Sequence, residues 1–129
     1  EDPDWTAAVP LLAGPAREAS RVITSNSMKA LYYLGRYDLE LNATIVPETD
    51  RGAEFGLDER TGRRVISRPE SVERVLSEPG ESIVVLESEK IGRPSGVPAD
   101  TFEAVRTHCR ELAVPEATRI RAWRCLPRG

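Results

Sequence analysis

The sequence has little of what supports several common function classes. Only two of its basic residues are lysines, Lys29 and Lys90, and the 129-residue chain carries a net charge of −3. A net acidic domain has no global positive field to draw it onto nucleic acid or anionic lipid, so we expect no nucleic-acid partner. Genomic base composition explains the preference for arginine over lysine better than phosphate binding does.

No stretch of the sequence is long and apolar enough to cross a membrane. The longest apolar runs are 83–86 and 7–13, the second broken by Pro10, whereas a span needs about 20 residues. The chain shows no signal peptide and opens abruptly at what looks like a helix start. We therefore expect 1–129 to be a single soluble α/β domain excised from a longer membrane protein.

The motifs of most enzyme classes are missing as well. Neither G-x-G-x-x-G nor a P-loop lysine motif occurs, so no nucleotide cofactor is expected. His108 is the only histidine, it lies in a predicted helix, and no nucleophile-elbow motif accompanies it. Two thiols and one histidine are a poor metal set, because His108 points to a different helix face from Cys109. We expect no catalytic residue, no cofactor and no metal site.

The two cysteines, Cys109 and Cys125, fall late in a predicted helix and at the end of the last predicted strand. That strand can fold back beside the helix, and a disulfide closing the loop would stabilise the fold by about 3 kcal/mol. Two buried free thiols are the alternative. We favour the disulfide, because cysteines that flank one helix-turn-strand unit suit an oxidising compartment.

Apolar periodicity and turn residues predict the order of the elements. Helices are expected over 4–20, 28–34, 67–78 and 100–112, the last two opened by Ser67–Glu70 and Asp100–Glu103 capping boxes. Strands are expected over 21–25, 38–45, 82–86 and 119–125, with a hairpin joining 55–57 to 64–66 through Gly62. This alternation predicts a three-layer, Rossmann-like α/β sandwich, with a mainly parallel sheet of about four strands plus the small hairpin.

The strands differ in their expected surroundings. The continuous apolar run 82–86 is typical of a central strand covered on both faces. The segment 38–45 alternates apolar with polar residues, which predicts a sheet edge with one solvated face. The final strand places arginines around Trp123, and charged guards on an edge strand explain this better than a surface for nucleic acid or anionic glycans.

Polar residues follow two of the predicted strands. Ser25, Asn26 and Ser27 lie between the first strand and a helix, where an open parallel sheet often binds ligands and helix N–H groups hold anions. A helix cap made by these side chains is the simpler interpretation. Glu87 follows the central strand and is a candidate for acid/base or ligand contact, although a solvated strand end is favoured. We give little weight to the glycosylation sequon 42–44.

Several segments together resemble a known family. They are Asp4-Trp5 before the 21–23 strand, the run 31–36 (Leu-Tyr-Tyr-Leu-Gly-Arg), the run 60–66 leading into 71–76, and the ending 120–125. With these segments the chain resembles the soluble C-terminal extracytoplasmic domain of bacterial membrane glycosyltransferases, the mannosyltransferase-like group that uses polyprenyl-phosphate sugars.

The resemblance implies a non-catalytic role. In that family the catalytic acid lies in a loop near the first membrane spans, which this chain lacks, so no catalytic residue is carried over. The domain would help recognise an acceptor or cover the active site, on the extracytoplasmic side of a bacterial membrane. Its partners would be the membrane-embedded portion of the same polypeptide and a glycan or lipid-linked sugar. A free-standing periplasmic or secreted module that binds a small ligand is the alternative.

Overall fold

The computed structural model describes residues 2–43, 56–58 and 60–127. Its helices are α1 (Trp5–Glu18), α2 (Ser27–Leu34), α3 (Pro69–Leu76) and α4 (Ala99–His108), with the 3₁₀ turns η3 (Ser88–Lys90) and η4 (Glu116–Thr118). Its strands are β1 (Arg21–Thr24), β2 (Leu39–Leu41), β3 (Gly56–Leu57), β4 (Arg64–Ile66), β5 (Ser82–Glu87), β6 (Arg110–Glu111) and β7 (Ile120–Cys125).

The strands form one mixed, seven-stranded sheet in the order β3-β4-β2-β1-β5-β7-β6. Strands β4, β2, β1 and β5 are parallel, whereas β3, β7 and β6 pair antiparallel with their neighbours. The α/β class is therefore confirmed. The predicted sheet of about four mainly parallel strands is wrong in size, because the sheet has seven strands and is mixed. After α4 the chain runs back along the sheet edge through β6 and η4, so β7 enters opposite to β5.

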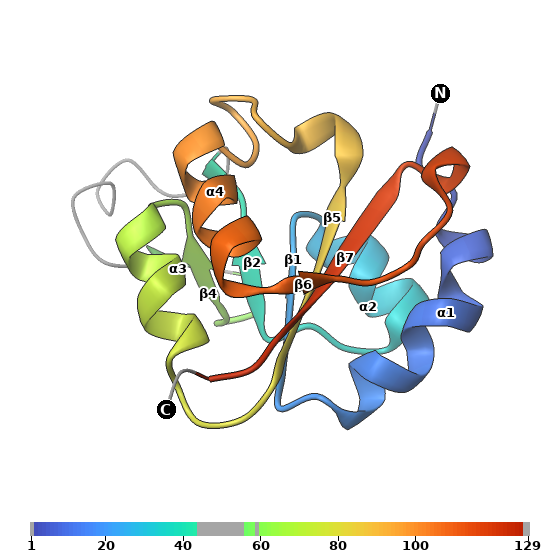
Figure 1. Ribbon diagram of the computed structural model, residues 1–129, viewed down its shortest axis with the longest axis horizontal. Helices are drawn as coiled ribbons and strands as arrows, with labels where there is room; N and C mark the ends of the chain where they lie inside the picture. Colours follow the sequence, from blue (N-terminus) through green and yellow to red (C-terminus); the bar gives the residue numbers. More distant parts are fainter. Residues whose placement is uncertain (1, 44–55, 59, 128–129) are drawn as a thin grey trace.

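Helices cover both faces of the sheet, as Figure 1 shows. On one face, side chains of α1 and α2 bury a core around Leu12, Val22 and Val85. On the other, side chains of α3 and α4 pack around Ile23 and Trp123. The β5 residues are all buried, which confirms the expected central strand. Its continuous apolar run follows from this double covering.

Strand β2 corrects one expectation. It lies between β1 and β4 rather than at an edge, and Glu40 and Asn42 are only 4% and 9% exposed. The polar face is buried because Asn42 donates to the carbonyl oxygen of Ser25 and so satisfies part of its hydrogen bonding inside. Alternating polarity therefore marked an internal polar row and not a solvated face. The predicted end of this strand lies outside the described residues.

Helix α1 begins as predicted. The Asp4 carboxylate accepts a hydrogen bond from the Ala7 N–H, as an N-cap does. The helix continues through Pro10 and Pro15 without a break. The other two caps were predicted wrongly, because neither Arg68 before α3 nor Pro98 before α4 makes a side-chain cap hydrogen bond.

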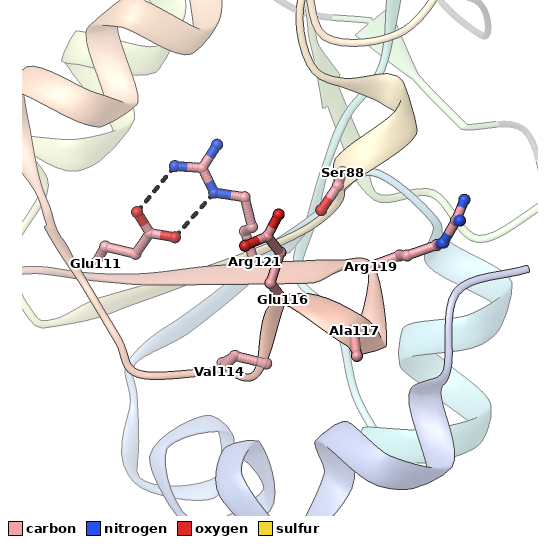
Figure 2. A pocket seen from close by; sticks show the side chains of 7 residues that line it. All are labelled: Ser88, Glu111, Val114, Glu116, Ala117, Arg119 and Arg121. Carbon is pink, nitrogen blue, oxygen red and sulfur yellow. Dashed lines mark hydrogen bonds and ion pairs between the residues drawn. The ribbon is translucent and has the colours of Figure 1, made fainter.

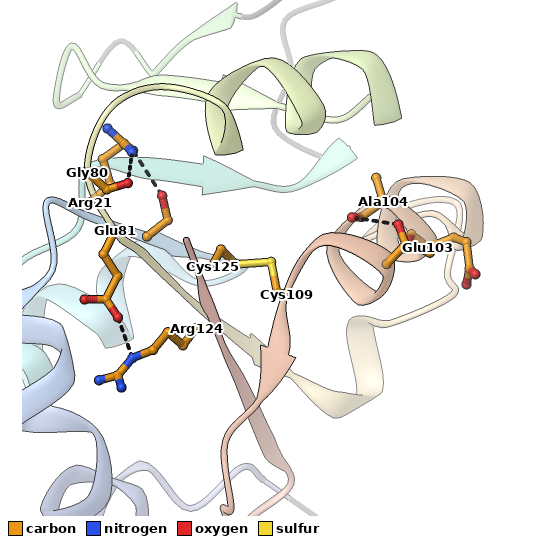
Figure 3. The surroundings of a disulfide bond; sticks show 10 residues. Arg21, Gly80, Glu81, Glu103, Ala104, Cys109, Arg124 and Cys125 are labelled. Atoms are coloured by element: carbon orange, nitrogen blue, oxygen red, sulfur yellow. Dashed lines mark hydrogen bonds and ion pairs between the residues drawn. A yellow bond between two sulfur atoms is a disulfide. The ribbon is translucent and has the colours of Figure 1, made fainter. Parts of the chain in front are cut away.

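The predicted last helix is shorter than expected. It ends at His108, and Cys109 is its C-cap, directly before β6. Strand β6 was not predicted, because two residues show no periodicity. Cys109 and Cys125 form a disulfide with 4.4 Å between their Cα atoms, which confirms the predicted pairing (Figure 3). The bond joins the end of α4, directly before β6, to the end of β7. Since β6 lies outside β7, the final strand is internal and not the guarded edge we expected.

Candidate functional site

The sheet has a topological switch point at the carboxyl ends of β1 and β5. From β1 the chain proceeds through α2 to β2 on one side, whereas β5 lies on the other side and is reached through α3 on the opposite face. Open α/β sheets commonly bind ligands in the crevice at this position. The predicted site residues Ser25, Asn26 and Glu87 all lie here.

The structure brings these residues into one hydrogen-bonded cluster. Asn26 Nδ2 donates to both Glu87 carboxylate oxygens, at 3.3 and 3.2 Å. The indole Nε1 of Trp5 donates to Glu87 Oε2 at 2.9 Å. The Glu87 N–H donates to Ser25 Oγ at 3.0 Å. Glu87 is 4% exposed, so the expectation of a solvated strand end was wrong: α1 supplies the indole that covers and satisfies it.

Asn26 also serves as the N-cap of α2. Its Oδ1 accepts a hydrogen bond from the Lys29 N–H at 3.1 Å, which is the helix cap favoured by the sequence over an anion site. Ser27, the first residue of the helix, is 5% exposed. These side chains therefore use their hydrogen-bonding groups to join α1, α2 and β5, and the usual crevice is filled by the Trp5 side chain.

A second polar group lies in the middle of β2, on the face that α1 and α2 cover. Glu40 Oε1 is buried and accepts no hydrogen bond among the described residues, while Glu40 Oε2 is 3.4 Å from Asn42 Nδ2. Burial raises the pKa of Glu40, an effect that hydrogen bonding from Ser27 and Asn42 only partly offsets. The raised pKa and the orphaned oxygen set Glu40 apart from Asp58, Glu78, Glu103 and Glu111, whose pKa values are all lowered.

Asp58 interacts electrostatically with Glu40, but its own pKa is shifted in the opposite direction. Its carboxylate accepts three hydrogen bonds from Arg60, one from the backbone N–H and two from the guanidinium group. The hydrogen bonds from the Arg60 side chain lower the pKa of Asp58, while the Asp58 charge contributes to raising the pKa of Glu40. Neither carboxylate was singled out from the sequence. Glu40 was missed because β2 was placed at an edge, where a glutamate is ordinary.

An open pocket of about 840 Å³ lies on the opposite side of β5, beyond the switch point. It is lined by residues from η3, β6, η4, β7 and their connections: Ser88, Glu111, Val114, Glu116, Ala117, Arg119 and Arg121. Figure 2 shows these side chains around the concavity. Two carboxylates and two guanidinium groups balance in charge, and a serine and two small apolar side chains complete the wall.

Arg121 is held rigidly at the wall of this pocket. Its Nε and Nη2 donate to the two carboxylate oxygens of Glu111 at 2.8 and 2.9 Å. Its guanidinium carbon lies 5.0 Å from the ring centroid of Trp123 and 5.5 Å from that of Phe102. The hydrogen bonds from Arg121 lower the pKa of Glu111. A paired, stacked guanidinium group offers its remaining N–H groups in a fixed direction.

Arg119 adopts an uncommon backbone conformation at the rim. Its φ of 59° lies in the left-handed region, which costs an arginine about 1 kcal/mol or more. Its carbonyl oxygen accepts a hydrogen bond from the Ser88 N–H at 2.9 Å, which ties the start of β7 to the end of β5. Arg119 and Arg121 were predicted only as charged residues guarding an edge strand, because the short turn η4 leaves no periodic signal in the sequence.

His108 Nε2 lies 3.4 Å from Glu73 Oε1, and no hydroxyl group among the described residues is paired with it as in a catalytic triad. No group of three or more histidine, cysteine, aspartate or glutamate side chains suited to a metal occurs in the described ranges. Part of the sequon 42–44 and the expected loop 47–52 lie outside the described residues.

Comparison with known proteins adds no family. No protein-family model matches the chain, and neither does any curated protein or solved structure. Among the described helices, none is long and apolar enough to span a membrane. The functional argument therefore rests on the geometry of the described residues.

Proposed function

We propose that the chain is a non-catalytic accessory domain of a bacterial membrane glycosyltransferase that uses polyprenyl-phosphate sugars. It lies on the extracytoplasmic side and helps to recognise the glycan or lipid-linked acceptor, or to cover the active site in the membrane-embedded portion. The observation that carries this proposal is the charge-balanced pocket at Arg121. Fixed carboxylate and guanidinium groups bind vicinal hydroxyls well, and balanced charge suits a neutral polyhydroxylated ligand.

The residues of the resemblance support a structural domain rather than a catalytic one. Gly35 ends α2 in the left-handed conformation, with φ of 80°, and its N–H donates to the Leu31 carbonyl. Arg36 then donates hydrogen bonds to backbone carbonyls at the end of α1 and just beyond it: those of Ala16, Ala19 and Ser20. The Leu-Tyr-Tyr-Leu-Gly-Arg run thus joins two helix ends. The disulfide fits an oxidising, extracytoplasmic compartment.

Binding to the pocket is tested by NMR titration of the chain with neutral mono- and disaccharides and with a short polyprenyl phosphate. We expect shifts of the Glu116 and Arg121 amides to saturate with the saccharides. Glu116→Gln should weaken binding, whereas Glu70→Gln on α3, outside the pocket, should not. No saccharide shifting these amides at millimolar concentration would refute acceptor recognition at this pocket.

The glycosyltransferase context has a separate test in the coding sequence. The proposal requires several membrane spans to be encoded in frame ahead of Glu1. A free-standing periplasmic or secreted ligand-binding module is the second candidate, and the open pocket at Arg121 is the observation that favours it. Saccharide binding without an upstream membrane region would select this second candidate.

A further inference from the structure

Three large apolar side chains on α2 are exposed and unexplained by the fold. Met28 is 64% exposed, Leu31 43% and Tyr32 81%. Their spacing of i, i+3 and i+4 places them on one side of the helix, while Ser27 and Ala30 face the interior. We call Met28, Leu31 and Tyr32 the α2 patch. Contiguous exposed apolar groups of this kind usually mark an interaction surface.

Helix α2, which carries the α2 patch, contains no carboxylate, and Glu18 at the end of α1 is the one acidic residue in the two helices of this layer. No aspartate or glutamate occurs over 5–17 or 19–37, although the chain has 21 acidic residues in all. The only charged residue of α2 is Lys29, which lies 5.8 Å over the Tyr33 ring. The helices on the other face differ, because α3 and α4 carry four acidic residues: Glu70, Glu73, Asp100 and Glu103. Acidic groups are thus concentrated in the α3 and α4 layer, and α2 has none.

The size and chemistry of the patch decide between possible occupants. Its side chains expose on the order of a few hundred Å² of apolar surface, well below the roughly 800 Å² per partner of a stable protein interface. A lipid bilayer needs no matching surface, and its interface accommodates tyrosine, methionine and leucine side chains beside a lysine that reaches the phosphates. Such an interface disfavours carboxylates, and α2 has none.

We propose that the α2 patch docks onto the surface of a lipid bilayer, with Tyr32 and Met28 inserted at the boundary of headgroups and acyl chains and Lys29 at the phosphate level. Because the net charge of the chain is −3, insertion rather than long-range attraction drives the contact. Binding should therefore persist when the salt concentration is raised. The inference is independent of the glycosyltransferase proposal, since a free-standing domain with this surface would bind in the same way.

The test is flotation of the chain with vesicles of phosphatidylcholine containing phosphatidylglycerol, at millimolar lipid and at low and high salt. The affinity of the Met28→Ser/Tyr32→Ser variant for the vesicles should be lower by a factor of about ten or more. Leu126→Ser is the matched control, because Leu126 is 65% exposed but lies beyond β7. It should bind like wild type. Circular dichroism checks that each variant is folded.

A second measurement locates the contact. A paramagnetic lipid in bicelles should broaden the amide signals of α2 more than those of α4. Lack of flotation by the wild-type chain would overturn the proposal, and so would equal broadening of both helices. Equilibrium sedimentation tests whether the patch instead joins two copies of the chain. A wild-type dimer that becomes a monomer in the Met28→Ser/Tyr32→Ser variant would show this and would refute docking onto a bilayer.

Discussion

Glu40→Gln tests the electrostatics of the sheet interior. The substitution keeps the size of the side chain and removes a charge that is 4% exposed. In the wild-type chain, Glu40 Oε1 is buried without a hydrogen-bond donor among the described residues. A buried group without a hydrogen-bond partner costs more when it is charged than when it is neutral, so glutamine keeps an unpaired polar atom but removes the penalty for the buried charge. We expect Glu40→Gln to raise the free energy of unfolding at pH 7 by about 1–2 kcal/mol.

The pH dependence of stability gives the same prediction a sign. Burial raises the pKa of Glu40 above its ordinary value of 4.5, so the folded chain binds this proton more tightly than the unfolded chain does. The contribution of Glu40 to the free energy of unfolding is fully present below pH 4.5. This contribution is lost as the pH rises through the pKa of Glu40 in the folded chain. Glu40→Gln removes this decline. Asp58 acts in the opposite direction, because its lowered pKa stabilises the fold above 3.8 and that stability is lost in stronger acid.

Urea unfolding at a series of pH values between 4 and 8, followed by tryptophan fluorescence, measures this difference. Glu18→Gln, at an exposed position on α1, is the control and should leave the profile unchanged. The variant minus wild-type difference should grow with pH across this range. A Glu40→Gln chain that is less stable than wild type at pH 7, or that keeps the wild-type pH slope, would refute the reasoning.

Three further substitutions test contacts that hold the elements together. Cys109→Ala/Cys125→Ala removes the cross-link between two residues that are 16 positions apart. It should lower the free energy of unfolding by about 3 kcal/mol in denaturant titrations. A loss below about 1 kcal/mol would contradict the loop-entropy estimate. Trp5→Phe removes the indole donor to Glu87 and should cost about 1–3 kcal/mol, with an unchanged melting temperature counting against it. Arg36→Met should selectively speed amide exchange at the end of α1, and uniform exchange would contradict this.

Periodicity predicted the parts of the fold that pack by a regular pattern. The strand 82–86 was placed correctly because its apolar run is buried on both faces, and the first helix because Asp4 caps it. Strand β6 was not found, since a two-residue strand is defined only by its pairing with β7. The position of β2 was missed because alternation reports which side of a strand is polar and not whether another strand covers its edge.

The candidate site shows the same division. Asn26 was recognisable as a helix cap, because capping is a local property of the chain. The bond from Trp5 to Glu87 joins residues 82 positions apart, and no local pattern predicts it. The Arg121 pocket depends on β7 running antiparallel to β5, which the alternation of helices and strands predicted to be parallel. Apolar periodicity therefore does not predict contacts that depend on the direction of a strand.

The location of the pocket follows from how this sheet departs from a parallel one. In an open parallel sheet the crevice between β1 and β5 would hold the ligand. Here the Trp5 side chain occupies this position and donates a hydrogen bond from its indole to Glu87. The antiparallel return through η4 builds a new wall at the same edge of the sheet, one strand further along, and joins it to β5 through Ser88. Opening the original crevice would leave the Glu87 carboxylate without its indole donor. The ligand site that we propose therefore lies beside β7, and a ligand found between β1 and β5 would contradict that proposal.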